Sequence, residues 1–141
     1  MKNIAGKLAS VLLVVLAICL ASCGGAEVAD ELWKNATYSE DTSLGTGVTT
    51  VEVEVKAGEK SVTFTLKTDR KILGDALSDH GLIAGEESQY GLFVKTVNGI
   101  SADYDVDGYY WGFYKNGEYM MTGVDGAEIS DGEHYELVRT R

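Results

Sequence analysis

The sequence predicts an α+β domain in which one helix packs on a small, mostly antiparallel sheet. Residues 48–67 alternate apolar and polar side chains in two runs, residues 72–80 change to a helical period, and the rest forms strand-like runs separated by glycine turns. A strand pair followed by one helix and further strands is the order of an α+β domain. Neither an internal repeat nor a second domain is visible, so we expect residues 48–141 to fold as one unit.

The first strand pair is predicted by its period of two. Val51, Val53 and Val55 alternate with charged residues, and so do Val62, Phe64 and Leu66 with threonine and lysine. The loop at residues 57–60 contains a glycine. This pattern is typical of an antiparallel hairpin with one buried face.

A helix is predicted between residues 70 and 80. Ile72, Leu73, Ala76 and Leu77 share one helical face. Thr68-Asp69 offers an N-cap, and Gly81 is placed to end the helix. Gly74 costs such a helix about 1 kcal/mol relative to alanine, so its stability must come from packing on the sheet.

Later strands are separated by turns built without proline, which the chain lacks. Asn116-Gly117 indicates a tight hairpin, because both residues tolerate the positive φ angles of a type I′ turn. The expected strands and turns are 91–97, Asn98-Gly99, 109–114, Asn116-Gly117, 119–121, Asp131-Gly132 and 134–140, the last with Tyr135, Leu137 and Arg139 on one side.

The first 22 residues are predicted to be a lipoprotein signal peptide. Lys2 and Lys7 precede an apolar run at residues 8–20, which is short for a membrane span but suits the core of a signal peptide. Leu20-Ala21-Ser22-Cys23 resembles the lipobox of bacterial lipoproteins, which makes Cys23 the predicted lipidation site. The alternative is an ordinary secretory signal with a chance cysteine. Residues 23–47 are small, polar and acidic, and are expected to form a flexible tether to the outer face of the cell membrane.

Composition limits the partners. The net charge is −10, and removal of the leader takes away two lysines and no acid, which argues against nucleic acid as a partner. The two cysteines are Cys19, in the leader, and Cys23, so no disulfide is expected in the mature domain.

A family resemblance rests on several motifs between Leu73 and Val138. The matching segments are Ile72-Leu73-Gly74-Asp75-Ala76-Leu77, Val97-Asn98-Gly99-Ile100, Tyr110-Trp111-Gly112-Phe113-Tyr114-Lys115-Asn116-Gly117-Glu118, Gly123-Val124 and Ile129-Ser130-Asp131-Gly132-Glu133. Together they resemble the transcobalamin-like C-terminal domain, classified as a domain of unknown function. The resemblance implies a β-grasp-like fold. It also implies cobalamin or another corrinoid as a possible ligand, although the helical barrel that completes vitamin B12 carriers is not expected here.

The candidate ligand-binding residues come from the aromatic hairpin. Alternation places Tyr109, Trp111 and Phe113 on one face of a strand and Tyr110 and Tyr114 on the other. One face must be core, and the other is either ordinary surface or a binding face. The candidates are Tyr110, Trp111, Tyr114, Tyr119 and Met121, with Trp111 lining the site or supporting it from the core.

Metal-binding and catalytic patterns are weak. Asp103-Tyr104-Asp105-Val106-Asp107-Gly108 is similar to the start of an EF-hand loop, but its twelfth position is Tyr114 instead of glutamate, so a solvated acidic loop is the alternative. His80 and His134 have no nucleophile placed beside them by any motif. The leading hypothesis is therefore a membrane-anchored, extracytoplasmic, non-enzymatic ligand-binding lipoprotein that requires no cofactor. The alternative is a cell-surface protein-interaction or adhesion module.

Overall fold

A computed structural model describes residues 30–141. The predicted signal peptide at 1–22 and the predicted lipidation site Cys23 lie outside these residues. Within the described part, none of the helices has both the length and the apolar character that crossing a bilayer requires.

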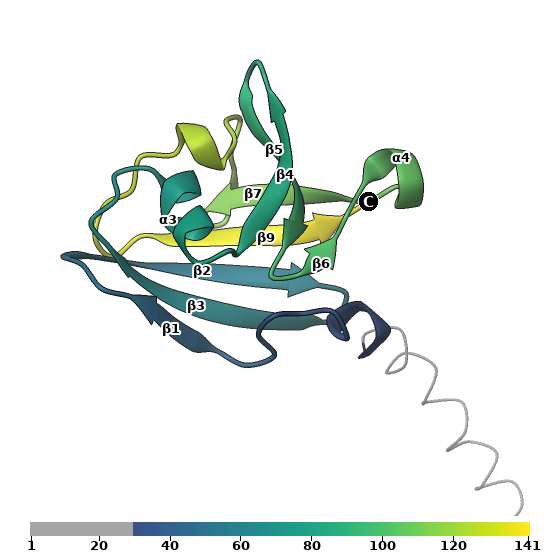
Figure 1. Ribbon diagram of the computed structural model, residues 1–141, viewed down its shortest axis with the longest axis horizontal. Helices are drawn as coiled ribbons and strands as arrows, with labels where there is room; N and C mark the ends of the chain where they lie inside the picture. Colours follow the sequence, from purple (N-terminus) through teal and green to yellow (C-terminus); the bar gives the residue numbers. More distant parts are fainter. Residues whose placement is uncertain (1–29) are drawn as a thin grey trace, which may run out of the picture.

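The main sheet has six strands in the order β1-β3-β2-β9-β7-β8 (Figure 1). They are β1 (Thr42–Gly45), β2 (Thr49–Ala57), β3 (Lys60–Thr68), β7 (Tyr110–Lys115), β8 (Glu118–Tyr119) and β9 (His134–Thr140). The predicted hairpin of β2 and β3 is confirmed, with Val53 opposite Phe64. The β1–β3 and β2–β9 pairs are parallel and the other three pairings are antiparallel.

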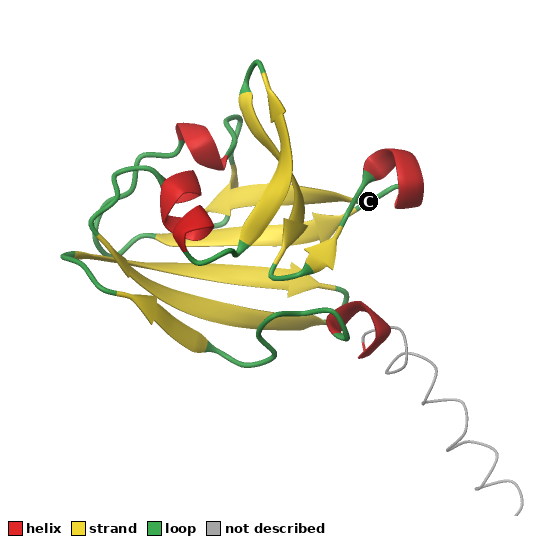
Figure 2. Cartoon of the chain, in the orientation of Figure 1, coloured by secondary structure: helices red, strands yellow, loops and turns green. Residues whose placement is uncertain are grey.

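A second sheet lies over the main one, and the sequence did not predict it. Strands β4 (Ile83–Ser88), β5 (Gly91–Val97) and β6 (Ile100–Ser101) form it. Short helices connect the strands of the two sheets: α3 (Leu73–Asp79), α4 (Tyr104–Asp107) and η1 (Val124–Gly126) (Figures 1 and 2). The fold is thus a mixed, strand-dominated one with a larger main sheet than expected. Strand β4 was missed because five of its six residues are exposed and it contains no apolar alternation.

One face of the main sheet forms the core, and α3 and the second sheet cover it. The alternation read from the sequence is confirmed for the apolar residues, because those that point inward from β2, β3, β7 and β9 are buried, whereas Arg139 is only half-buried. The buried residues are Val51, Val53, Val55, Ala57, Val62, Phe64, Leu66, Trp111, Phe113, Tyr135 and Leu137. The opposite face, here called the open face, carries the outward residues of the same strands and is not covered by α3 or the second sheet (Figure 1).

Helix α3 is where it was expected, but its N-cap is not. Leu73, Ala76 and Leu77 are buried, and Gly81 follows the helix with a φ of +65°. The predicted N-cap at Thr68-Asp69 is wrong, because the helix begins after Ile72 and has no side-chain cap. The helix packs closely against η1, because a Cβ at Gly74 would clash with the Asp125 side chain.

The predicted tether is wrong for residues 30–47. Residues 30–33 are helical, Trp33 is 6% exposed, and β1 pairs with β3. The indole Nε1 of Trp33 donates a 2.9 Å hydrogen bond to the carbonyl of Ala57. The folded domain therefore begins well before Val48.

The Asn-Gly turns are confirmed, whereas the strand after the second one is shorter than predicted. Asn98 and Gly99 have φ angles of 51° and 79°, and Asn116 and Gly117 have 50° and 82°, all in the left-handed region. Strand β8 ends at Tyr119, so Met121 lies beyond it.

Candidate functional site

Three of the predicted site residues gather on the open face at the β7–β8 hairpin. Tyr110 and Tyr114 point outward from β7, and Tyr114 pairs across the hairpin with Tyr119. The Tyr114 and Tyr119 rings meet edge to face, with centroids 5.5 Å apart. Tyr119 is 56% exposed. We call Tyr110, Tyr114 and Tyr119 the tyrosine platform.

Gly112 gives the platform its flat surface. A Cβ at this position would lie 3.1 Å from Cε2 of Tyr114, so the tyrosine ring covers the backbone where another residue would carry a side chain. Absence of a side chain between Tyr110 and Tyr114 leaves room for a ring to lie along the strand.

The other two predicted residues do not join the platform. Trp111 points to the opposite side of β7, is 8% exposed, and lines a pocket of about 140 Å³ between β5 and β7 together with Phe93 and Val124. Its Nε1 is buried without a hydrogen-bond partner among residues 30–141. Met121 is 91% exposed, beyond the end of β8. Of the two roles considered for Trp111, the structure therefore supports packing in the core, not membership of the platform.

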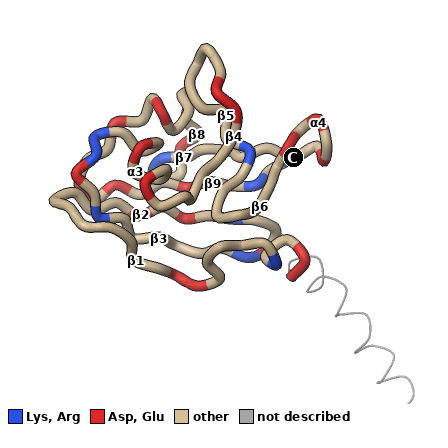
Figure 3. The backbone as a smooth tube through the Cα atoms, in the orientation of Figure 1, with Lys and Arg blue, Asp and Glu red and all other residues tan. Residues whose placement is uncertain are grey.

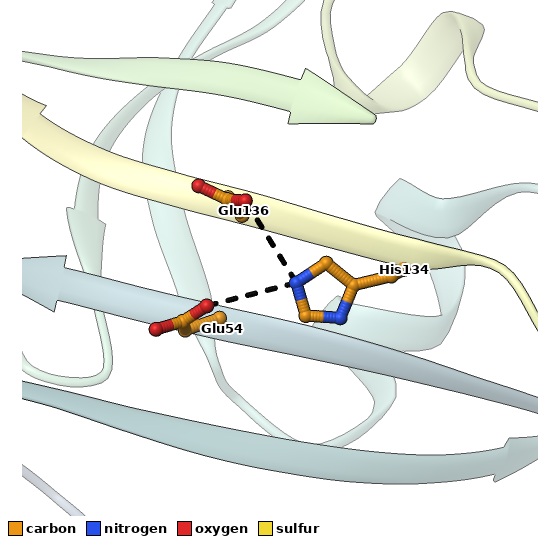
Figure 4. Close-up of side chains that lie close together, drawn as sticks. All are labelled: Glu54, His134 and Glu136. Carbon is orange, nitrogen blue, oxygen red and sulfur yellow. Dashed lines mark ion pairs between the residues drawn. The ribbon is translucent and has the colours of Figure 1, made fainter. Parts of the chain in front are cut away.

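A second cluster stands beside the platform and was not predicted. His134 of β9 lies among three carboxylates. Its Nδ1 is 3.3 Å from Glu52 Oε2. Its Nε2 is 3.6 Å from Glu54 Oε2 and 3.8 Å from Glu136 Oε1 (Figure 4). Glu136 also pairs with Tyr114 across β9 and β7. The platform and this cluster therefore form one continuous surface.

The chain supplies a counter-charge to the cluster. Lys56 Nζ is 3.1 Å from Glu136 Oε2 and 3.8 Å from Glu54 Oε2. The hydrogen bond to Glu136 raises the pKa of Lys56 above its ordinary value, against a smaller opposing effect of burial. Lys56 therefore stays positively charged and forms ion pairs with both Glu54 and Glu136.

The cluster can also place three donor atoms around one cation. One ligand atom each of Glu54, His134 and Glu136 lies within 4.8 Å of the other two, and all three residues are half-buried. Imidazole nitrogen with carboxylate oxygen is a donor set that suits Zn²⁺. Sequence reasoning missed this set because β2 and β9 pair in parallel across some 80 residues; the only local signal is that Glu52-Glu54 and His134-Glu136 each show strand alternation.

Two of the three carboxylates of the EF-hand-like segment, those of Asp103 and Asp107, are held by the protein's own donors. Asp103 caps α4 by accepting from Asp105 N, and its Oδ2 is 3.2 Å from Lys95 Nζ. Asp107 Oδ1 accepts from Tyr109 N, and its Oδ2 accepts from Arg139 Nη2 at 3.0 Å. The segment is thus a capped helical turn, which favours the acidic-loop interpretation over a calcium loop.

These bonds predict acid sensitivity. Burial acts to raise the pKa of Asp107, but hydrogen bonds from the backbone of Tyr109 and Asp103, together with Arg139, lower it below the ordinary 3.8. A lowered pKa stabilises the fold above the ordinary value, and that stabilisation is lost as the pH falls through the folded-state pKa. We expect Asp107→Asn to lose up to about 1 kcal/mol at pH 7 and to flatten the fall of melting temperature between pH 5 and 2.

The exposed neighbour Asp105 offers the control for this change. Asp105→Asn removes the same charge from the same turn and is expected to keep the wild-type pH profile. Equal profiles for both variants and the wild type would show that Asp107 carries no such linkage.

Comparisons with known proteins identify relatives. Residues 71–135 match the family model described as "Domain of unknown function (DUF4430)". A crystal structure from Ruminococcus gnavus, of a protein to which metal binding is provisionally assigned, is 34% identical with a TM-score of 0.63. The match covers 67% of this chain and 98% of that one. Among curated proteins, none matches the sequence.

Haptocorrin in complex with Cbi (cobinamide) shares the fold. Identity is 19% and the TM-score is 0.51, and the match covers 70% of this chain and 26% of haptocorrin. At this identity the likeness concerns the fold alone, and it supports the transcobalamin-like relation that the motifs indicate. On the family-model match and the 34% identical relative, the chain belongs to the DUF4430 family, with a transcobalamin-like relation.

Proposed function

We propose that the protein is a membrane-anchored, extracytoplasmic ligand-binding lipoprotein without enzymatic activity, and that its ligand is a corrinoid such as cobalamin. The observation that carries the proposal is the tyrosine platform. Single exposed aromatic residues are common on protein surfaces, but several that lie together on a sheet face are typical of a recognition surface.

The shape of the platform suits a broad, flat ligand. The ring of Tyr114 lies over Gly112, and Tyr119 stands edge-on beside it. A corrin ring can stack on such a surface, and the polar groups at its edge can meet Lys56, Glu136 and Glu54 next to it. The haptocorrin complex supports this choice, because a protein of the same fold binds cobinamide.

The anchor is the second part of the proposal. The apolar leader and the Leu20-Ala21-Ser22-Cys23 motif support export and lipid attachment. Two or more acyl chains on Cys23 would hold the domain stably at the membrane surface.

Titration of the mature chain without its lipidated cysteine, residues 24–141, tests the ligand, and the experiments below use this same form. We expect saturable binding of cobalamin or cobinamide by calorimetry, and a roughly tenfold loss in affinity for Tyr119→Ala, equivalent to about 1.4 kcal/mol of lost ring contact. Tyr104→Ala is the matched control, because Tyr104 is an exposed tyrosine on α4. Flat titrations with both corrinoids, or equal losses in the two variants, would contradict the proposal.

A divalent metal is a second candidate ligand, favoured by the Glu54–His134–Glu136 cluster. The provisional metal-binding description of the R. gnavus relative supports it. Lys56 opposes it, because its ammonium group already contacts two of the carboxylates. A bound Zn²⁺ would have to displace Lys56, so affinity should rise when this positive charge is removed.

The two histidines of the chain provide a matched test. We expect Zn²⁺ to raise the melting temperature of the wild type and of His80→Asn, to have no effect on His134→Asn, and to bind more tightly to Lys56→Met. An unchanged melting temperature of the wild type, or an equal response of both histidine variants, would remove this candidate.

A further inference from the structure

Strand β7 has one edge that β8 covers only at its C-terminal end, so the edge near Trp111 has no strand paired with it among residues 30–141. Hydrogen bonds in an antiparallel pair alternate sides along a strand. Asn116 N donates to His134 O at 2.9 Å, which places the backbone groups of even-numbered β7 residues toward β9. Met120 N donates to Phe113 O at 2.9 Å on the other side. The N–H and C=O of Trp111 therefore point away from β9, along the same side as Phe113.

No strand among residues 30–141 pairs with Trp111 on that side. Strand β8 pairs only with Tyr114 and Lys115, and the chain leaves the sheet after Met120. Unpaired backbone groups on an edge strand are a template on which another strand can add.

An apolar pocket lies beside this edge. It measures about 140 Å³ between β5 and β7, and its lining includes Phe93, Trp111, Phe113 and Val124. A cavity of about 150 Å³ holds one benzene ring, so this pocket has the size for a single apolar side chain. It is too small for a drug-sized ligand, for which about 300 Å³ or more is usual.

Acidic residues flank the pocket. Glu86 and Glu87 of β4 are paired with Phe93 and Leu92, and Asp125 follows Val124 and accepts a hydrogen bond from Leu92 N. Figure 3 shows the acidic stretch on β4 next to β5. With a chain charge of −10, this surface favours a basic partner.

We propose that the open β7 edge binds an extended, basic segment of a partner protein by strand addition. The segment pairs with the N–H and C=O of Trp111 and inserts one apolar side chain into the pocket, while its lysine or arginine residues face Glu86, Glu87 and Asp125. Backbone pairing supplies affinity in this mode of recognition, and the pocket supplies selectivity.

A synthetic peptide tests the backbone pairing. The probe is Lys-Thr-Lys-Phe-Lys-Thr-Lys with blocked ends, titrated against ¹⁵N-labelled mature chain. We expect the Trp111 amide to shift on saturation and its hydrogen exchange to slow at least tenfold. Two further peptides carry methyl groups on one or the other alternate set of backbone nitrogens, so that a different edge of each cannot donate hydrogen bonds. Only one of the two should keep the affinity of the parent. Equal binding of both methylated peptides and the parent would overturn the proposal.

Gly123 also lines the pocket, and its backbone tolerates a side chain. Its φ is −76°, and a Cβ there has no atom within 4 Å. We expect Gly123→Leu to weaken the probe at least tenfold at an unchanged melting temperature, whereas Gly123→Ala should bind like the wild type. Replacing the phenylalanine of the probe by aspartate should weaken binding to the same extent as Gly123→Leu.

Three results would overturn strand addition by a partner segment. They are no binding at millimolar probe, a Trp111 amide that does not respond, and equal affinity of Gly123→Leu and the wild type. Concentration-dependent dimers in sedimentation that Gly123→Leu abolishes would also overturn it, because a second copy of this chain would then occupy the edge. The probe contains no corrinoid, so failure here and failure of the corrinoid titration are separate results.

Discussion

Replacing Trp33 by alanine is expected to destabilise the domain by about 3–5 kcal/mol, as removal of a buried tryptophan does. The side chain is buried in the core, and its Nε1 donates to the carbonyl of Ala57 at the end of β2. The Lys60 ammonium lies 5.2 Å from the centre of the ring. One residue of the segment expected to be a tether thus closes one end of the β2–β3 hairpin.

Urea unfolding of the mature chain measures this effect. Trp33→Phe keeps an apolar ring but loses the hydrogen bond, so its loss should be smaller than that of Trp33→Ala. Tyr90→Ala removes an exposed aromatic ring from the β4–β5 turn and should change the free energy of unfolding by less than about 0.5 kcal/mol. A loss below about 1 kcal/mol for Trp33→Ala would mean that the segment around residue 33 does not belong to the folded domain.

Asn98→Ala is expected to cost about 2–4 kcal/mol, because two effects add. The Asn98 side chain is 0% exposed and ties down the segment before β1: its Oδ1 accepts from Tyr38 N and its Nδ2 donates to Tyr38 O, both at 2.9 Å. Alanine would leave both backbone groups without these partners. It would also have to adopt the φ of 51°, which asparagine tolerates better.

The other Asn-Gly turn separates these effects. Asn116 has a φ of 50° but is exposed, so Asn116→Ala incurs the backbone cost alone. The difference between the two losses in free energy of unfolding therefore measures the link between Asn98 and Tyr38. Equal losses would show that this link contributes nothing to stability.

Local patterns predicted the elements that short-range physics determines. Alternation of valines with charged residues identified β2 and its partner β3, and the helical period identified α3. Asn116-Gly117 and Asn98-Gly99 were recognisable because few residues adopt left-handed φ angles at low cost.

Elements that depend on distant partners could not be predicted in this way. Strand β1 has four residues and becomes a strand only by parallel pairing with β3, which follows it by about 20 residues. The segment before β1 does carry a local signal, because the aromatic residues Trp33 and Tyr38 stand isolated in a polar stretch. An apolar ring in such a stretch indicates docking rather than a free tether.

In the candidate site, too, the features set by local alternation were predictable and those set by distant strand pairing were not. Alternation placed Tyr110 and Tyr114 on one face and Trp111 on the other, as the structure has them. The Glu54–His134–Glu136 cluster was not predictable, because only the parallel pairing of β2 with β9 brings its members together. Met121 was included because the returning strand was expected to extend beyond Tyr119.

Mapping cobinamide on the ¹⁵N-labelled mature chain tests the proposed function most directly. We predict that saturating ligand shifts the amides of Tyr110, Tyr114 and Tyr119, together with those of their neighbours on the open face, and leaves the amides of α4 unchanged. Spectra without shifts at millimolar cobinamide, or shifts confined to residues away from the open face, would contradict it.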